Sequence, residues 1–379
     1  MALLQLAAPC LMGLEGLCAD ELKRQDIEKV RAENGRVLFE GDWSTIARAN
    51  LCSRYAERVR ILLGEFPVYS PEDLFQGVSK IPWEDFIGSH DAFPVKGHSI
   101  GSKMSSVPAC QKLIKKAAAN RLGRHYGVSW LEESGSLHQI EFLILKNQCS
   151  ILLDTSGAGL HKRGYRANAT TAPIKETLAA AMAELSRVRP FSTVIDPFCG
   201  SGTILIESAL KALHIAPGLK RSFAAEQWGV IPAKVWREER DRALSQIDND
   251  AAFQAYGYDI DPEAVALTLE NARKAGVEKR IHAEQRDIRD FDTTPDRAAV
   301  ITNPPYGERL LDMEQARELY RIMGETFTAR QGWSYSVISP DDGFEMAFGR
   351  PADKRRKLYN GMIKCQLYMY FRNASAGGR

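Results

Sequence analysis

Short apolar runs alternate with helical patterns in the C-terminal part of the chain. From Thr193 onward, the candidate central strands are TVID (193–196), QAYGYD (254–259), AAVIT (298–302) and SYSVIS (334–339). In TILIESALKAL and PEAVALTLENARKAG, which follow the first two runs, apolar residues recur at helical spacing. Strands that alternate with helices predict an α/β domain, whose sheet is mostly parallel and carries helices on both faces.

The N-terminal part follows a different order of elements. Residues 14–24 place apolar side chains at helical spacing, and GRVLFEG (35–41) is expected to form a short strand between glycines. A further strand is expected at NQCSILLDT (147–155), and the glycine-rich segment after it places a domain boundary near residues 160–170. These patterns predict a small α+β region before the α/β domain. A length of 379 residues fits two or three domains.

Positive charge is concentrated in one segment of the N-terminal part. The whole chain has 50 Lys and Arg against 48 Asp and Glu, so its net charge of +2 indicates no particular partner. Between Asp91 and Glu132, however, no acidic residue occurs. Pro108 begins a predicted helix, on which three lysines share one outward face. This surface is either simply solvated or a binding site for a nucleic-acid phosphate backbone. The seven basic residues of the segment are Lys96, Lys103, Lys112, Lys115, Lys116, Arg121 and Arg124, and the three on one face are Lys112, Lys115 and Lys116.

Cysteines and apolar segments narrow the class of protein further. The seven cysteines are scattered and form no C-x-x-C pair, which is typical of a reduced cytoplasmic protein without a zinc site. The apolar opening, MALLQLAAPCLMGLEGLC, lacks the basic start of a signal peptide. No segment reaches the ~20 apolar residues of a membrane span. We therefore expect a cytoplasmic protein that binds neither a membrane nor a metal ion.

A glycine-rich motif, DPFCGSGT (196–203), stands between the first predicted strand and the helix after it. Ligands of doubly wound sheets bind at the carboxyl ends of the strands, and Gly200 and Gly202 would let the backbone approach a ligand closely. No Gly-Lys-Ser/Thr follows, which excludes a P-loop, and Leu205 stands where the dinucleotide motif has its third glycine. The motif therefore favours a nucleoside ligand that has no pyrophosphate.

Two acidic residues stand at the ends of later strands. Asp259, in GYDID, ends the second predicted strand, where a carboxylate can accept hydrogen bonds from both ribose hydroxyls. Asp261, which precedes a proline, fits the start of the next helix instead. Asp287, in EQRDIRDF, could accept a hydrogen bond from an adenine amino group. Taken alone, Asp259 or Asp287 would be an ordinary loop or surface residue.

The motif NPPYG follows the strand AAVIT and indicates the reaction class. An exocyclic base amine is a poor nucleophile, because its lone pair is delocalised into the ring. Acceptors on its two N–H groups favour the pyramidal, nucleophilic geometry, and the Asn303 side chain and the Pro304 carbonyl could provide them. Pro305 stiffens the loop, and Tyr306 would stack on an extruded base. The alternative is a rigid turn after a buried strand.

Together, DPFCGSGT, YDID, RDI and NPPYGERL resemble the class I S-adenosyl-L-methionine (SAM)-dependent amino-methyltransferases, which have a Rossmann-like fold. The resemblance implies that the glycine motif lies along the methionine part of the cofactor, with Asp259 at its ribose and Asp287 near its adenine. The implied cofactor-binding residues are Asp196, Phe198, Cys199, Gly200, Ser201, Gly202, Thr203, Asp259, Ile260, Asp287, Ile288 and Asn303. The implied catalytic residues are Asn303, Pro304, Pro305 and Tyr306.

The rest of the chain resembles the THUMP-domain RNA methyltransferases, in particular the guanine-N2 methyltransferase half of the bacterial 23S rRNA enzyme. LDTSGAGLHKRGYR and APIKETLAAAM are typical of the junction between the THUMP and catalytic domains. The resemblance implies that residues 163–177 fold back against the cofactor pocket and that Lys354–Lys357 contact phosphate. It also implies a helical insertion around Trp228 and Trp236. The implied domains are a ferredoxin-like unit (1–60), a THUMP RNA-binding domain (61–162) and a Rossmann-like methyltransferase domain (163–379).

The preferred hypothesis is methylation of guanine N2 in structured RNA, namely 23S rRNA. One alternative is a DNA adenine-N6 methyltransferase, because an N-P-P-Y motif serves both adenine and guanine amines. Another is an RNA-binding ribosome assembly factor without catalytic activity. Methylation of cytosine C5 would require a nucleophilic cysteine, whereas Cys199 lies within the cofactor loop and the motif around Pro304 offers none.

Overall fold

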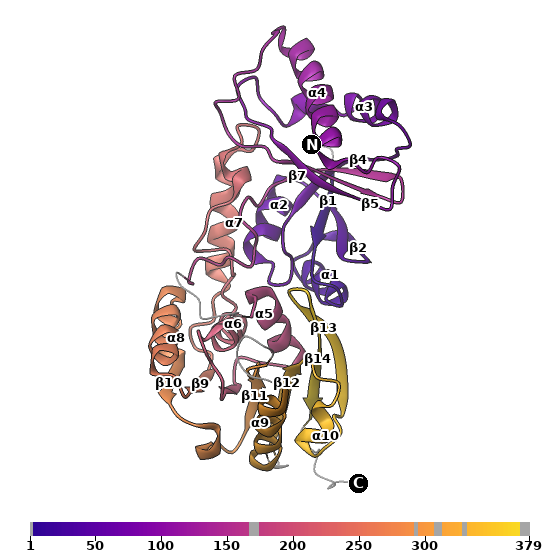
Figure 1. The fold of residues 1–379 in the computed structure, drawn as a ribbon. Coiled ribbons are helices and arrows are strands. Elements are labelled where there is room, and N and C mark those ends of the chain that lie inside the picture. Colours follow the sequence, from indigo (N-terminus) through magenta and orange to yellow (C-terminus); the bar gives the residue numbers. More distant parts are fainter. Residues whose placement is uncertain (1–2, 167–173, 292–294, 307–312, 328–331, 372–379) are drawn as a thin grey trace, which may run out of the picture. The chain divides into compact units, whose positions relative to one another are not determined.

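The chain forms two compact units in the computed structural model (Figure 1). The described residues are 3–166, 174–291, 295–306, 313–327 and 332–371. Each unit contains one sheet, and the α/β architecture expected from the sequence is confirmed. The first unit consists of Met1–Cys10, Cys18–Leu160 and Ser222–Arg242, and the second of Leu11–Leu17, His161–Arg221 and Ala243–Arg379.

A mixed sheet forms the first unit. In the described part of the chain its strand order is β2-β3-β1-β4-β7-β6-β5, and β5 and β6 pair in parallel. The expected helix at Pro108 is confirmed, with Ser106 as its N-cap. The strands are β1 (Leu4–Pro9), β2 (Glu28–Glu33), β3 (Arg36–Gly41), β4 (Arg60–Pro67), β5 (Val95–Ile100), β6 (Ile140–Leu145) and β7 (Gln148–Asp154). The helices wholly or mainly in this unit are α1 (Glu15–Arg24), α2 (Trp43–Cys52), α3 (Pro71–Ser79), α4 (Val107–Tyr126) and α7 (Ala233–Ser245).

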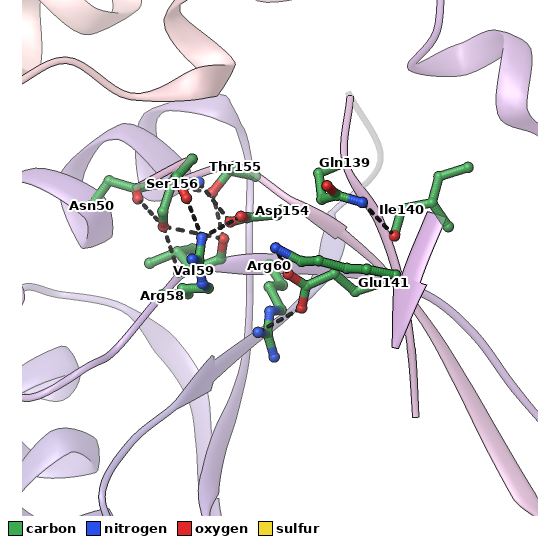
Figure 2. Close-up of polar contacts among 12 residues, drawn as sticks. Asn50, Arg58, Val59, Arg60, Gln139, Ile140, Glu141, Asp154, Thr155 and Ser156 are labelled. Atoms are coloured by element: carbon green, nitrogen blue, oxygen red, sulfur yellow. Dashed lines mark hydrogen bonds and ion pairs between the residues drawn. The ribbon is translucent and has the colours of Figure 1, made fainter. Parts of the chain in front are cut away.

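The sheet of the first unit continues across the boundary expected at residue 60, because β4 pairs with both β1 and β7. A buried polar network lies at the end of β7 (Figure 2). The Asp154 carboxylate pairs with the Arg58 guanidinium and accepts a 3.0 Å hydrogen bond from the Ser156 amide. The Asn50 side chain donates to the Thr155 hydroxyl at 2.9 Å and accepts from the Ser156 hydroxyl at 2.6 Å. The sheet and this network join the first two domains expected from the sequence.

We expect Arg58→Ala to destabilise the first unit by about 3 kcal/mol, because it leaves the buried Asp154 carboxylate without its cation. Burial raises the pKa of Asp154, and Arg58 opposes this shift. Without Arg58 the pKa rises further above its unfolded value, so the deficit should grow as pH increases above about 4. Chemical denaturation of the wild type and the variant at pH 5 and pH 8 measures this difference in unfolding free energy. The exposed control variant Arg31→Ala should change stability by less than about 0.5 kcal/mol, and an equal loss for both variants would contradict this role.

The expected helical insertion packs within the first unit, although the sequence pattern assigns it to the α/β domain. Residues Ser222–Arg242 contain part of α7, whose Glu239 accepts a 2.7 Å ion-paired hydrogen bond from Arg48. Trp228 stacks on the buried His138 with ring centroids 4.5 Å apart. Residues 222–242 thus belong to the core of the first unit, although in the sequence they lie between two strands of the second unit, 193–196 and 254–259.

A mostly parallel sheet forms the second unit. Its order in the described part is β10-β9-β8-β11-β12-β14-β13, and the first five strands are parallel while β14 and β13 form an antiparallel hairpin (Figure 1). The strands are β8 (Thr193–Asp196), β9 (Gln254–Asp259), β10 (Ile281–Gln285), β11 (Ala298–Thr302), β12 (Trp333–Ser339), β13 (Lys354–Asn360) and β14 (Ile363–Tyr370). The helices are α5 (Glu176–Leu185), α6 (Thr203–Ala212), α8 (Pro262–Ala275), α9 (Met313–Thr326) and α10 (Phe344–Phe348).

The elements of this unit form where the apolar pattern predicts them. All five residues of β11 are buried, as expected for a central strand covered on both faces. The side chain of Asp261 caps α8 by accepting from the Glu263 amide at 2.9 Å, and Gly276 ends this helix at φ 79°. Of the helices within the described ranges, none has the length and apolar character needed to cross a membrane.

Aromatic side chains fix the β13–β14 hairpin to the rest of the second unit. Tyr368 and Tyr370 of β14 stack on Phe344 and Phe348 of α10, with ring centroids 4.5 and 4.9 Å apart. The Tyr368 hydroxyl also donates to the Asp341 carbonyl at 3.0 Å. Because each ring is buried, these contacts hold the base of the hairpin in one position.

Candidate active site

A wide cleft lies at the carboxyl ends of the parallel strands in the second unit. Its volume is about 2170 Å³, which exceeds the ~300–1,000 Å³ of typical small-molecule pockets and leaves room for two ligands. All but one of the site residues expected in the second unit line it, Gly202 being the exception. They are Asp196, Phe198, Cys199, Gly200, Ser201, Thr203, Asp259, Ile260, Asp287, Ile288, Asn303, Pro304, Pro305 and Tyr306.

The loop after β8 brings the glycine motif against the end of β9. Gly200 adopts φ 52°, and its amide donates a 3.0 Å hydrogen bond to the Asp259 carboxylate. Gly202 adopts φ 77°, and a Cβ there would lie 2.8 Å from the Thr268 side chain of α8. Close packing between the loop and α8 therefore requires glycine at position 202, and the close approach to a ligand expected from the sequence stays a prediction.

Asp196 is the most deeply buried acid of the cleft, with 1% of its surface exposed. Its carboxylate accepts from the Thr302 hydroxyl at 2.6 Å and from the Phe198 amide at 3.1 Å. Burial raises the pKa of Asp196 to about 7, although both hydrogen bonds oppose the shift. A cationic group bound in the cleft would stabilise the carboxylate and offset the cost of its burial.

Backbone amides fix two further acids of the cleft, Asp259 and Asp287. The second carboxylate oxygen of Asp259 accepts from the Asp261 amide at 3.0 Å. Asp287 caps the 3₁₀ helix Ile288–Asp290 by accepting from the Arg289 amide at 2.8 Å. Each carboxylate oxygen keeps a lone pair for a ligand. Beside them, Ile260 leaves 67% of its surface exposed in the cleft, which suits contact with a flat apolar ring.

The turn after β11 places an unpaired acceptor in the cleft. The side-chain oxygen of Asn303 is buried and has no hydrogen-bond partner in the described part of the chain. The Tyr306 hydroxyl accepts from the Asn360 amide group at 2.9 Å and lies 3.9 Å from the Cys365 sulfur, so this tyrosine ties the turn to the β13–β14 hairpin. Burial raises the pKa of Tyr306, which keeps the phenol neutral. The remainder of the motif, residues 307–310, lies outside the described residues.

Three supporting residues were not identified from the sequence. Thr302 holds Asp196, and Asn360 holds Tyr306. Arg166 donates to the Thr203 hydroxyl at 2.7 Å and to the Ile174 carbonyl at 3.0 Å, which connects the junction segment to the glycine loop. Residues 167–173 of that segment, expected to fold back against the pocket, lie outside the described residues. These contacts depend on residues that are far apart in the sequence and leave no local pattern.

The thiol of Cys199 is suited to packing rather than to nucleophilic attack. Its side chain is buried and lies 3.6 Å from the Thr268 hydroxyl. Burial raises the pKa of Cys199 far above its usual range, so the thiolate is not accessible near neutral pH. The geometry therefore supports chemistry without a covalent enzyme intermediate.

The basic segment of the first unit is more neutralised than its sequence suggested. Lys96 pairs with Glu141 at 3.0 Å, Lys115 pairs with Glu133, and Arg121 forms two hydrogen bonds with Glu84. Lys115 also donates to the Phe93 carbonyl and lies over the Phe93 ring, so it does not share the outward face expected for it. The members that keep no carboxylate partner in the described ranges are Lys103, Lys112, Lys116 and Arg124.

Family models identify the parts of the chain. Residues 163–369 match the model described as "RMKL-like, methyltransferase domain". The chain belongs to the RMKL-like methyltransferase family. In this RMKL-like methyltransferase, residues 5–60 match the RlmL ferredoxin-like domain and residues 68–154 match the THUMP domain.

Relatives of this RMKL-like methyltransferase match it over nearly its whole length. It is 40% identical over 368 residues to the putative RNA methyltransferase YpsC of Bacillus subtilis, covering 97% of this chain and 95% of YpsC. It is 32% identical over 380 residues to the ribosomal RNA large subunit methyltransferase K/L of Syntrophotalea carbinolica, covering 94% of this chain but only 52% of that enzyme. The chain thus spans about half the length of the K/L relative.

A solved structure has the same fold. The crystal structure of SMU.472, a putative methyltransferase complexed with S-adenosylhomocysteine (SAH), superposes with a TM-score of 0.94 at 40% identity, covering 99% of both chains. The RMKL-like methyltransferase therefore uses SAM as its cofactor. The buried Asp196 carboxyl and the amide-held carboxylate of Asp259 fit a cofactor with a cationic end and a ribose. The family and the THUMP domain both imply RNA as the substrate class.

Proposed function

We propose that this RMKL-like methyltransferase methylates the exocyclic N2 amine of a guanine in 23S rRNA. The unpaired, buried side-chain oxygen of Asn303 is the observation that carries the proposal. A buried acceptor without a partner is costly, and an amine that enters the cleft brings N–H donors to satisfy it. The likeness to the K/L relative supports large-subunit rRNA as the substrate. The choice of guanine N2 follows the motif resemblance stated from the sequence.

The turn of residues 303–306 after β11, called the catalytic turn below, would act on the amine alone. Asn303 accepts one amine N–H, and the Pro304 carbonyl accepts the other, which favours the pyramidal nitrogen with a localised lone pair. Pro305 has no backbone N–H that could compete for these acceptors. Tyr306, held by Asn360, supports the base. The amine nitrogen would gain the methyl group as the bond from the methyl carbon to the sulfonium sulfur breaks and SAH leaves, and it would lose one proton to solvent. No residue of the protein forms a covalent bond in this step.

The cofactor side of the cleft would be held by the loops after β8, β9 and β10. SAM supplies an electrophilic methyl group on a sulfonium. Asp196 would pair with its α-ammonium group, and Asp259 would accept hydrogen bonds from its ribose hydroxyls. Ile260 and Ile288 would contact the adenine ring, while Asp287 would accept from the adenine amino group. This arrangement uses the acids that backbone amides or burial already fix in place.

Methyl transfer from labelled SAM to purified nucleic acids tests the proposed function. Deproteinised rRNA and duplex DNA should be offered separately to the purified full chain. We expect label in rRNA and none in DNA. Label only in DNA would favour adenine-N6 methylation and refute the RNA assignment. Binding of rRNA without any label, together with no binding of SAH, would favour a non-catalytic assembly factor.

The exposed lysines of α4 should contribute to RNA affinity. Replacing both Lys112 and Lys116 by Ala should reduce the slope of log K against log salt by about 1.5, because two phosphate contacts are lost. The control variant, Lys115→Ala with Arg121→Ala, should change the slope by less than about 0.5, since carboxylates already neutralise these cations. Filter binding at four salt concentrations measures both slopes. Equal slopes for the first variant and the wild type would show that the RNA-binding surface lies elsewhere.

A further inference from the structure

The tip of the β13–β14 hairpin presents a methionine to solvent. Gly361 and Met362 form a two-residue turn between the paired residues Asn360 and Ile363. Gly361 adopts φ 63°, a conformation that glycine takes without strain at the first position of such turns. Met362 is 98% exposed, and Ile363 beside it is 48% exposed. The turn therefore carries apolar side chains where polar residues are usual.

The tip lies in the cleft, next to the catalytic turn. The last strand pair between β12 and β14 joins Ser339 to Gln366, so the residues of β14 before Gln366 extend past the carboxyl end of β12. Met362 lines the same cleft as Asn303. The hydrogen bond from Asn360 to Tyr306 attaches the tip directly to the catalytic turn. The hairpin that carries the methionine is thus anchored to the turn proposed to hold the reacting base.

Two lysines lie on the hairpin stem below the apolar tip. By register, Lys357 and Lys364 share one face of the hairpin with Tyr359, which pairs directly with Lys364 and lies under the Lys357 ammonium group. Both lysines are exposed, and neither has an ion-pair partner among the residues that the structure describes. In contrast, Arg355 further down β13 pairs with Glu345. An apolar tip that extends beyond a face with two ammonium groups is complementary to an RNA base step and the phosphates beside it.

We propose that Met362 inserts into the RNA stack at the place that the target nucleotide leaves, while Lys357 and Lys364 hold RNA phosphates on the face of the hairpin that they share. This inference rests on the proposed function. A base in a helical stack cannot reach Asn303, and extruding it costs a few kcal/mol of stacking. An apolar side chain inserted between base steps replaces part of the lost contact. The flexible, polarisable thioether of methionine adapts to different neighbouring bases.

The experiment compares Met362→Ser with the wild type on two forms of the same deproteinised 23S rRNA. One form is folded in Mg²⁺, and the other is heat-denatured and kept without Mg²⁺. We expect kcat/KM for the folded form to fall at least about tenfold and that for the denatured form to fall less than about twofold, because only a stacked base must be extruded. Met362→Leu should retain most activity on both forms, and the SAH affinity of all variants should equal that of the wild type.

The matched control is Phe191→Ser, which removes another exposed apolar side chain of the second unit, 76% exposed and outside the cleft. It should leave both rates unchanged. Equal losses of Met362→Ser on both forms, or none on the folded form, would overturn the inference while leaving the proposed function intact. If the wild type methylates neither form, the proposed function fails, and the inference falls with it.

Discussion

Replacing Asn303 by Ala should lower kcat by about 100-fold or more, while the Kd for SAH changes less than about threefold. The side-chain oxygen of Asn303 is buried and lacks a partner in the described structure, so its proposed contact is made with the amine. Removing one preorganised hydrogen-bonding group of this kind from a transition state costs roughly 10²–10³ in rate. Steady-state kinetics with labelled SAM and calorimetric titration with SAH measure the two quantities.

The control for this variant is Asn360→Ala, which frees the Tyr306 hydroxyl but leaves the Asn303 acceptor in place. We expect a loss of kcat of about tenfold or less. If Asn303→Ala weakened SAH binding as much as it slowed turnover, its role would be to bind the cofactor, and the proposed contact with the amine would be wrong.

Cofactor affinity should fall as pH decreases below about 7. Burial raises the pKa of Asp196 in the cofactor-free protein to about 7. The α-ammonium group of the cofactor favours the ionised form of this carboxyl. Below this pH a proton must be displaced, so the Kd for SAH should rise about tenfold for each pH unit down to the pKa of this carboxyl in the complex. Above about pH 7 the Kd should be flat while the ammonium group stays charged. Calorimetry between pH 5.5 and 8.5 measures this profile.

Asp196→Asn should remove this pH dependence and weaken SAH binding about 10- to 100-fold, the range for loss of a charge-assisted hydrogen bond.

The same variant, Asp196→Asn, should stabilise the cofactor-free protein. In the folded state the pKa of Asp196 lies above its unfolded value, so its ionisation destabilises the fold as pH rises from about 4 to about 7. Because Asn carries no charge to bury, the melting temperature of the Asp196→Asn variant should exceed that of the wild type at pH 8. If the Kd for SAH rose equally steeply with falling pH in the variant and the wild type, the titrating group would be one other than Asp196.

The apolar pattern was sufficient to predict the catalytic fold and the grouping of its site. Residues 193–196, 254–259 and 298–302 are strands as expected, since central parallel strands need buried side chains on both faces. The motifs after them meet in one cleft because the carboxyl ends of parallel strands lie along one edge of the sheet.

What the sequence could not show depends on contacts between distant residues. The segment around Lys115 and Arg121 has no acid of its own, but Glu133 and Glu84 reach it from other elements. The packing of Gly202 against Thr268, which also requires glycine at this position, leaves no local pattern in the sequence. The insertion around Trp228 is fixed by stacking on His138, a partner 90 positions earlier in the chain.

Identifying the methylated nucleoside is the decisive measurement for guanine-N2 methylation through Asn303. The rRNA methylated by the purified wild type should be digested to nucleosides and analysed by mass spectrometry, with rRNA treated with Asn303→Ala in parallel. We expect N2-methylguanosine as the product of the wild type and almost none with the variant. N6-methyladenosine, a ring-carbon methylation, or an equal yield of product from both proteins would rule out transfer to guanine N2 assisted by Asn303.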